Sequence, residues 1–114
     1  MFFLKFSGYF YLFLAILFGV VANGLLKATN GFLNIPLTLL SISSIILCLY
    51  LLSKAMTTIP IGYAYATYSA LTIIFITIIG VVKYNQIPNI FSFIGIFLII
   101  IGVIFVNVLG KINN

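Results

Sequence analysis

Four apolar stretches, each about 20 residues long and separated by short polar connections, dominate this sequence. A helix needs about 20 apolar residues to cross the hydrocarbon core of a bilayer, so each stretch has the length of one span. The sequence therefore predicts an all-α integral membrane protein with four transmembrane helices and a single domain over residues 1–114. The predicted spans cover approximately residues 7–26, 35–53, 61–82 and 90–109.

The connections contain residues that begin or end helices. Asn30 and Gly31 follow the first stretch, and Gly31 is expected to cap its C-terminal end. Pro36 and Pro60 begin the second and third stretches, where proline is tolerated. Because the connections are short, consecutive helices must be antiparallel. The first stretch also resembles a signal peptide, but we interpret it as a span, since its removal would leave an odd number of helices.

Charged side chains are rare and all positive. The sequence has five lysines and no Asp, Glu or His, and a soluble domain would need far more charge to cover its surface. The lysines stand singly between apolar runs, so they predict membrane-end anchors and contact with the lipid bilayer, not nucleic-acid binding. Cys48 is the single cysteine. We therefore expect no disulfide, no metal site, no cofactor and no enzymatic activity.

The lysines leave the orientation in the membrane open. Four spans place Lys5, Lys54 and Lys111 on one side of the bilayer, and Lys27 and Lys83 on the other. This distribution is too even for the positive-inside rule to select an orientation. A fixed orientation set by other features is one interpretation. The other is dual topology, in which copies insert both ways and pair as an antiparallel dimer.

Aromatic and hydroxyl side chains share one face of the third predicted helix. Their spacing of i, i+3, i+4 and i+7 is that of a single helical face, formed by Tyr65, Tyr68, Ser69 and Thr72. Such a face is costly against lipid, so we expect it to point inward. Tyrosine rings bind cations through their faces, which makes this face a candidate cavity lining. An interfacial aromatic belt is the alternative, but Tyr68 lies too deep in the helix for one.

Further candidate residues, two asparagines and two glycines, lie on the first and fourth predicted helices. Asn23 is one turn beyond Gly19, and we expect it to bond across helices, with ligand contact as the alternative. Asn107 is expected to lie at the membrane interface. Gly95 and Gly102 fall on nearly the same face of the fourth helix, where small residues allow close helix approach and predict a dimer interface.

The order of these segments resembles the small multidrug resistance family over about Tyr9 to Gly110. Members of that family are four-helix proteins that work as antiparallel dimers and export quaternary ammonium compounds, guanidinium or polyamines in exchange for protons. The resemblance implies a multi-pass exporter of small cationic or amphipathic compounds in the bacterial inner membrane. It is carried by Ala22 to Lys27, Asn30 to Phe32, Ile59 to Ala66, and Gly95 to Val103.

Individual residues match the family pattern except at one position. Tyr65 falls where the family has its binding tyrosine, and Tyr68 falls where many members have tryptophan. Gly95 and Gly102 match the dimerisation glycines of the fourth helix. The essential first-helix glutamate, which binds both protons and cationic substrate, would fall at Gly19. The cavity that the resemblance implies is lined by Gly19, Asn23, Tyr65, Tyr68 and Ser69.

The missing glutamate leaves three interpretations open, because tyrosine and cysteine are protonated at neutral pH and do not replace it. The chain acts as a heterodimer with a Glu-bearing homologue, or it works as a homodimer that transports without a carboxylate. The third interpretation is an accessory subunit, similar to the acid-poor small subunits that flip lipid-linked sugars. Gly19 is either natural or the product of an engineered Glu-to-Gly change. The absence of every other acidic residue favours a natural change.

Overall fold

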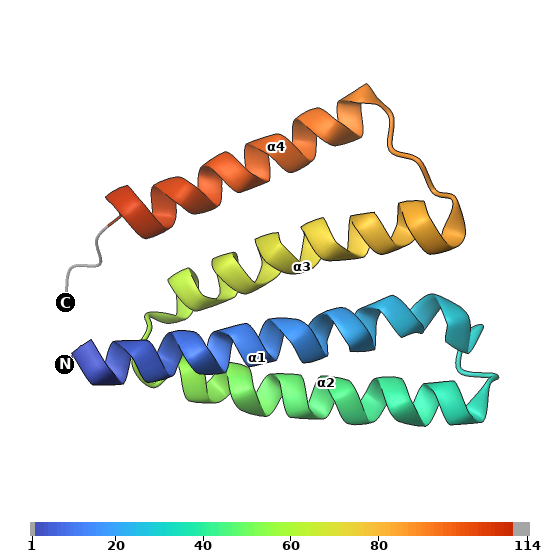
Figure 1. Ribbon diagram of the computed structural model, residues 1–114, viewed down its shortest axis with the longest axis horizontal. Coiled ribbons are helices and arrows are strands. Elements are labelled where there is room, and N and C mark those ends of the chain that lie inside the picture. The colour runs from blue at the N-terminus through green and yellow to red at the C-terminus, as the bar shows by residue number, and fades with distance from the viewer. Residues whose placement is uncertain (1, 111–114) are drawn as a thin grey trace. The chain divides into compact units, whose positions relative to one another are not determined.

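The computed structural model describes residues 2–110, with side chains from Phe6 onward, so Lys111 lies outside the described residues. The α-helices are α1 (Phe2–Leu26), α2 (Ile35–Ala55), α3 (Ile61–Tyr84) and α4 (Ile90–Ile104) (Figure 1). A 3-10 turn, η1 (Lys27–Thr29), follows α1, and a π-helical segment, η2 (Phe105–Leu109), continues α4.

The predicted fold class is confirmed, since the described residues contain four helices long and apolar enough to cross a membrane. Two of the helices run past the lysines at which the predicted spans end. The α2 helix continues through Lys54 to Ala55, and α3 continues through Lys83 to Tyr84. A lysine at a span end keeps helical backbone geometry while its long side chain carries the charge out to water. Lys54 and Lys83 therefore do not end their helices, and their role as membrane-end anchors stays a prediction.

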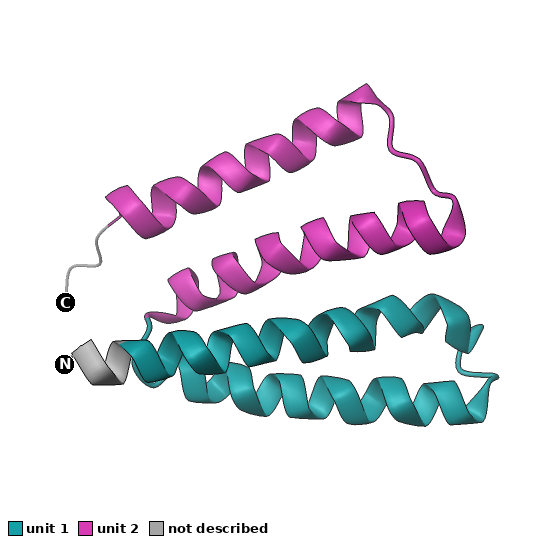
Figure 2. Ribbon diagram, viewed as in Figure 1, with its two compact units in different colours: residues 1–59 teal, residues 60–114 magenta. Residues whose placement is uncertain are grey.

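The helices form two compact units, residues 1–59 and 60–114 (Figure 2). The first unit contains α1, η1 and α2, and the second contains α3, α4 and η2. Within each unit the two long helices run antiparallel, as the short connections predict (Figure 1). That the four helices assemble into one domain stays a prediction.

In the first unit, α1 and α2 pack against each other, and most of their buried residues are small. The three- and four-residue spacing of these residues places them along one stripe of each helix. Small residues let backbones approach closely, and close packing replaces the hydrophobic effect between helices in lipid. The buried small residues are Gly8, Ala15, Gly19 and Ala22 on α1, and Thr38, Ser41, Ser44, Cys48 and Ala55 on α2.

Two contacts show how closely the first unit is packed. The buried Ser41 hydroxyl donates a hydrogen bond to the Ala22 carbonyl oxygen at 2.8 Å, so a very short side chain of α2 reaches the α1 backbone. At Gly8 a Cβ atom would collide with Thr58 Oγ1 and would lie 3.3 Å from Ile59 Cδ1. The segment that follows α2 therefore rests on the N-terminal part of α1.

The connection between α1 and α2 turns through left-handed backbone. Asn30, Gly31 and Phe32 have φ angles of 52°, 69° and 70°. The cap predicted at Gly31 is one residue earlier, because the Asn30 N–H bonds the Lys27 carbonyl oxygen at 3.3 Å. Asparagine and glycine are the residues that adopt this conformation most readily. Pro36 lies in the first turn of α2, as predicted.

In the second unit, the C-terminal end of η2 lies against the start of α3. The Gly110 N–H bonds the Phe105 carbonyl oxygen at 2.9 Å, the five-residue step of a π-helix. A Cβ atom on Gly110 would lie 2.6 Å from the Val106 carbonyl oxygen and 3.0 Å from the Tyr63 hydroxyl. A side chain at the exposed residue 110 would therefore require the η2 backbone or the Tyr63 hydroxyl to shift.

The Ser41 hydrogen bond leads to a stability prediction. The Ser41→Ala variant should unfold in a denaturing detergent titration with a free energy lower by about 0.6 kcal/mol, the average for such bonds in membrane helices. Ser43 is exposed on the same helix, so Ser43→Ala is the matched control and should leave the unfolding free energy unchanged. Equal loss in both variants would show that the bond to Ala22 does not stabilise the hairpin.

Candidate functional site

The aromatic face predicted on the third helix is present on α3. The ring centroids of Tyr65 and Tyr68 are 5.8 Å apart, with the ring planes tilted by 52°. Tyr65 is 54% exposed and Tyr68 only 8%, so the pair runs from an open surface into a buried position. Tilted aromatic pairs at this distance are mutually stabilising. The pair therefore offers one accessible ring whose orientation is held by a buried neighbour.

Hydroxyl groups continue this face along α3. Ser69 and Thr72 are both half-buried, and the Thr72 hydroxyl oxygen is buried without a hydrogen-bond partner among the described residues. A threonine in a membrane helix usually bonds a carbonyl one turn earlier, as Thr77 does to Ile73 at 2.7 Å. The Thr72 hydroxyl can therefore still donate and accept a hydrogen bond at this position of α3.

The two candidate residues on α1 lie one turn apart and are linked. Gly19 is buried, and the Asn23 side-chain amide donates to its carbonyl oxygen at 2.8 Å. This bond lies within α1, and it leaves a second amide N–H and the amide oxygen of Asn23, so the expected bond to another helix stays a prediction. The bond adds a second donor to the Gly19 carbonyl oxygen and keeps the polar amide close to the helix axis.

The structure describes the predicted site residues as two groups, one in each unit. Gly19 and Asn23 lie together on α1, while Tyr65, Tyr68 and Ser69 lie together on α3. Within each group the predicted proximity is observed. That the two groups line one cavity stays a prediction.

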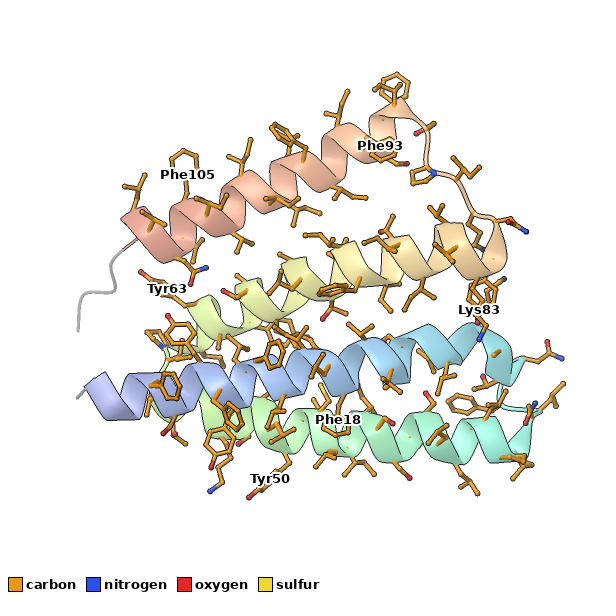
Figure 3. All side chains as sticks on the ribbon, viewed as in Figure 1. Phe18, Tyr50, Tyr63, Lys83, Phe93 and Phe105 are labelled. Atoms are coloured by element: carbon orange, nitrogen blue, oxygen red, sulfur yellow. The ribbon has the colours of Figure 1, made fainter. Side chains whose placement is uncertain are left out.

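The glycines predicted to form a dimer interface lie in open space. At Gly95 and at Gly102 a Cβ atom would meet no atom within 4 Å. None of the described residues of α4 is buried, and Phe105, which follows it, points away from α3 (Figure 3). These two glycines therefore have no packing role inside the described part of the chain.

A contact that the sequence did not predict joins α3 to η2. The Asn107 amide donates to Thr67 Oγ1 at 2.8 Å and to the Val103 carbonyl oxygen at 3.0 Å. The bond connects η2 to α3 at the residue before Tyr68, and the interfacial position expected for Asn107 stays a prediction. The sequence shows only that Asn107 is a polar residue near the end of an apolar run. It does not indicate that Thr67 is its partner.

The candidate site contains no charged side chain. The sequence has no Asp, Glu or His, and its single cysteine, Cys48, is buried on α2. A cation bound at the α3 face would therefore meet ring faces and hydroxyl oxygens. This donor set suits weakly hydrated organic cations better than transition-metal ions, which prefer imidazole, thiolate or carboxylate ligands.

Comparisons with known proteins agree with this arrangement. The family model described as Small Multidrug Resistance protein matches residues 7–99. The quaternary ammonium compound-resistance protein QacH of Staphylococcus saprophyticus is 36% identical over 103 residues, covering 90% of this chain and 96% of that protein. QacE of Escherichia coli is 34% identical over 105 residues, which are 92% of this chain and 96% of that protein. A multidrug transporter of Pseudomonas aeruginosa is 33% identical with the same coverage.

The Thr67–Asn107 bond can be measured by a double-mutant cycle. Thr67→Val and Asn107→Leu should each lower the unfolding free energy, and their combination should be less than additive by about 0.6 kcal/mol, because the second change removes a bond already lost. Thr77→Val is the control partner, since Thr77 bonds its own helix, and it should be additive with Asn107→Leu. Additivity of the Thr67 pair would contradict the link.

Proposed function

This chain belongs to the small multidrug resistance family and is a multi-pass membrane protein of the multidrug efflux type, and we propose that its substrates are small organic cations. Quaternary ammonium compounds are the first candidates, because relatives that align with nearly the whole chain are named for resistance to them. The bacterial relatives also support a location in the bacterial plasma membrane.

The Tyr65–Tyr68 pair is the observation on which this proposal rests. An aromatic ring face attracts a cation by about 0.5–2 kcal/mol, and quaternary ammonium groups are ligands that proteins commonly recognise in this way. The exposed ring of Tyr65 provides the first contact, and the half-buried Ser69 follows on the same face. Gly19, although it belongs to the buried stripe of α1, and Asn23 would complete the proposed cavity in an assembled four-helix domain.

The absence of a carboxylate limits what the site does by itself. Transfer of a cation into a low-dielectric cavity costs several kcal/mol of hydration, which tyrosine rings offset only in part. A carboxylate would balance the charge and exchange it for a proton, and Gly19 has no side chain to do either. We infer that a homodimer of this chain binds organic cations weakly and does not couple their export to protons.

A second candidate function follows from the same residue. A buried glycine where the family's glutamate would fall is the pattern expected of an acid-free subunit that pairs with a Glu-bearing homologue. The partner would then supply the carboxylate, and this chain would supply its tyrosine face. An accessory role in a lipid-linked sugar flippase is the remaining alternative, and the tyrosine pair gives no support to it.

Transport from liposomes distinguishes these functions. The purified chain is reconstituted alone and together with a Glu-bearing homologue, and efflux of a quaternary ammonium compound is followed with and without a pH gradient. We expect slow efflux without gradient dependence from the chain alone and gradient-driven efflux from the mixture. Gradient-driven efflux by the chain alone would refute the proposed absence of proton coupling. No efflux in either preparation would refute the transport function.

A glutamate at residue 19 should create pH-dependent binding. In Gly19→Glu, binding of a permanent organic cation should increase as the pH rises, because the carboxylate loses its proton and gains a charge that attracts the cation. Gly19→Gln has nearly the same shape without the charge and is the matched control. Equilibrium binding across a pH series checks this, and equal behaviour of the two variants would mean that residue 19 does not face the cation.

We propose that the working unit is a dimer in which the open glycines of α4 approach a second copy. Gly95→Leu and Gly102→Leu should lower the crosslinked dimer yield in mild detergent several-fold, because a branched side chain keeps helix backbones apart. Gly62 is also in open space but lies on α3, so Gly62→Leu is the control and should preserve the yield. Unchanged yields in all three variants would remove the α4 glycines from the interface.

A further inference from the structure

The positive charges of this chain have no negative side chain to balance them. The formal net charge is +5, and the sequence contains no Asp or Glu. Lys54 and Lys83 stand in the last turns of α2 and α3, and both are exposed. The negative end of a helix dipole stabilises a cation there by about 0.3–1 kcal/mol. Balancing a full charge requires an anion from outside the chain.

At the end of α2, aromatic contact positions the lysine and leaves its hydrogen-bond donors unused. Lys54 Nζ lies 5.8 Å from the centroid of the Tyr50 ring, one turn earlier on the same helix. The Lys54 carbonyl oxygen accepts from the Thr57 N–H at 3.2 Å and from the Thr57 hydroxyl at 2.7 Å. The Ala55 carbonyl oxygen accepts from the Thr58 and Ile59 N–H groups. The helix end is thus already capped, and the ammonium group is available for an external acceptor.

The end of α3 repeats this arrangement. Lys83 Nζ lies 5.6 Å from the centroid of the Tyr84 ring. The Gly80 carbonyl oxygen at this helix end accepts from the Asn85 and Gln86 N–H groups. Here too, backbone groups satisfy the end of the helix, and the lysine is held beside an aromatic ring with its ammonium group exposed.

Consecutive spans cross the bilayer in opposite directions, so the ends of α2 and α3 lie at opposite membrane surfaces. Phospholipid headgroups carry the phosphate oxygens found at that depth, and they are strong acceptors for ammonium groups. An exposed lysine at the membrane surface is attracted to anionic lipid, and the tyrosine ring limits the volume that its ammonium group explores.

We propose that Lys54 with Tyr50, and Lys83 with Tyr84, are binding sites for the headgroups of anionic phospholipids, one in each leaflet. Most membrane proteins concentrate lysines on one side and attract anionic lipid to one leaflet. In this chain the attraction is distributed over both, and anionic lipid serves as the counter-ion that the sequence lacks.

The chain has no tryptophan, so a single introduced tryptophan reports the lipid beside it. Tyr50→Trp preserves an aromatic face near Lys54, and Val82→Trp places the reporter at a 76% exposed position next to Lys83. Quenching by brominated phosphatidylglycerol and by brominated phosphatidylcholine, in vesicles of uniform composition, gives the relative binding constant of the two lipids. Uniform vesicles make the result independent of the orientation of each copy.

Both reporters should prefer phosphatidylglycerol. Adding Lys54→Gln to the first, or Lys83→Gln to the second, should reduce that preference roughly fivefold, the factor expected for one lysine near a charged surface. Lys54→Arg and Lys83→Arg should preserve it. Phe97→Trp lies in the middle of α4, far in sequence from any lysine, and should show no preference.

Three results would overturn the headgroup sites, and a fourth would overturn their distribution over both leaflets. The first is an equal affinity of the unmodified lysine sites for both lipids. The second is a phosphatidylglycerol preference that survives both glutamine changes. The third is loss of the preference on adding inorganic phosphate, but not chloride at equal ionic strength, since this would assign the sites to the free anion. A preference at only one reporter would overturn the two-leaflet arrangement.

Discussion

Inside a bilayer, a backbone N–H or C=O group has no water to bond, so each span must satisfy its own backbone. The four long helices of this chain are the direct consequence. The same requirement acts on side chains, and several hydroxyl and amide groups bond a nearby carbonyl oxygen. Thr38 bonds Asn34 and Thr77 bonds Ile73, while Asn23 bonds Gly19. Among the described residues, the buried hydroxyls of Thr58, Tyr63 and Thr72 depart from this pattern, and Thr72 lies on the face that carries the tyrosine pair.

Once each helix satisfies its own backbone, helices associate in lipid through close packing and a few polar contacts. The α1–α2 hairpin has both, with small buried residues and the Ser41–Ala22 bond. The α3–α4 hairpin depends more on its ends, where Asn107 bonds Thr67 and Gly110 lies against Tyr63. The chain therefore contains one densely packed hairpin and one whose last helix presents most of its surface to the surroundings.

The number, class and approximate limits of the helices could be predicted because length and hydropathy determine them. The hydrogen-bond partner of an asparagine side chain could not be predicted. Asn23 and Asn107 are both isolated amides near the ends of apolar runs, yet one returns to its own helix and the other reaches α3. The choice depends on where neighbouring backbone and hydroxyl oxygens lie, and the π-helical geometry of η2 is not visible in the sequence.

The candidate site was predictable to the same limit. Helical periodicity places Tyr65 and Tyr68 on a shared face, and the structure shows their rings in contact. Helical periodicity places residues around the axis of one helix, but it does not tell which face of another helix lies opposite them. Whether Gly19 lies near the tyrosines depends on how the faces of α1 and α3 oppose each other. Sequence resemblance provides it only by analogy.

The contact between Gly8 and Thr58 has a kinematic consequence. Because Thr58 and Ile59 rest on α1 and α3 begins at Ile61, Pro60 is the one residue between the two hairpins. Its ring fixes φ near the observed −53°, which leaves ψ as the one backbone torsion about which this residue rotates freely. The chain therefore passes from one hairpin to the next through a residue with half the rotational freedom of an ordinary connecting residue.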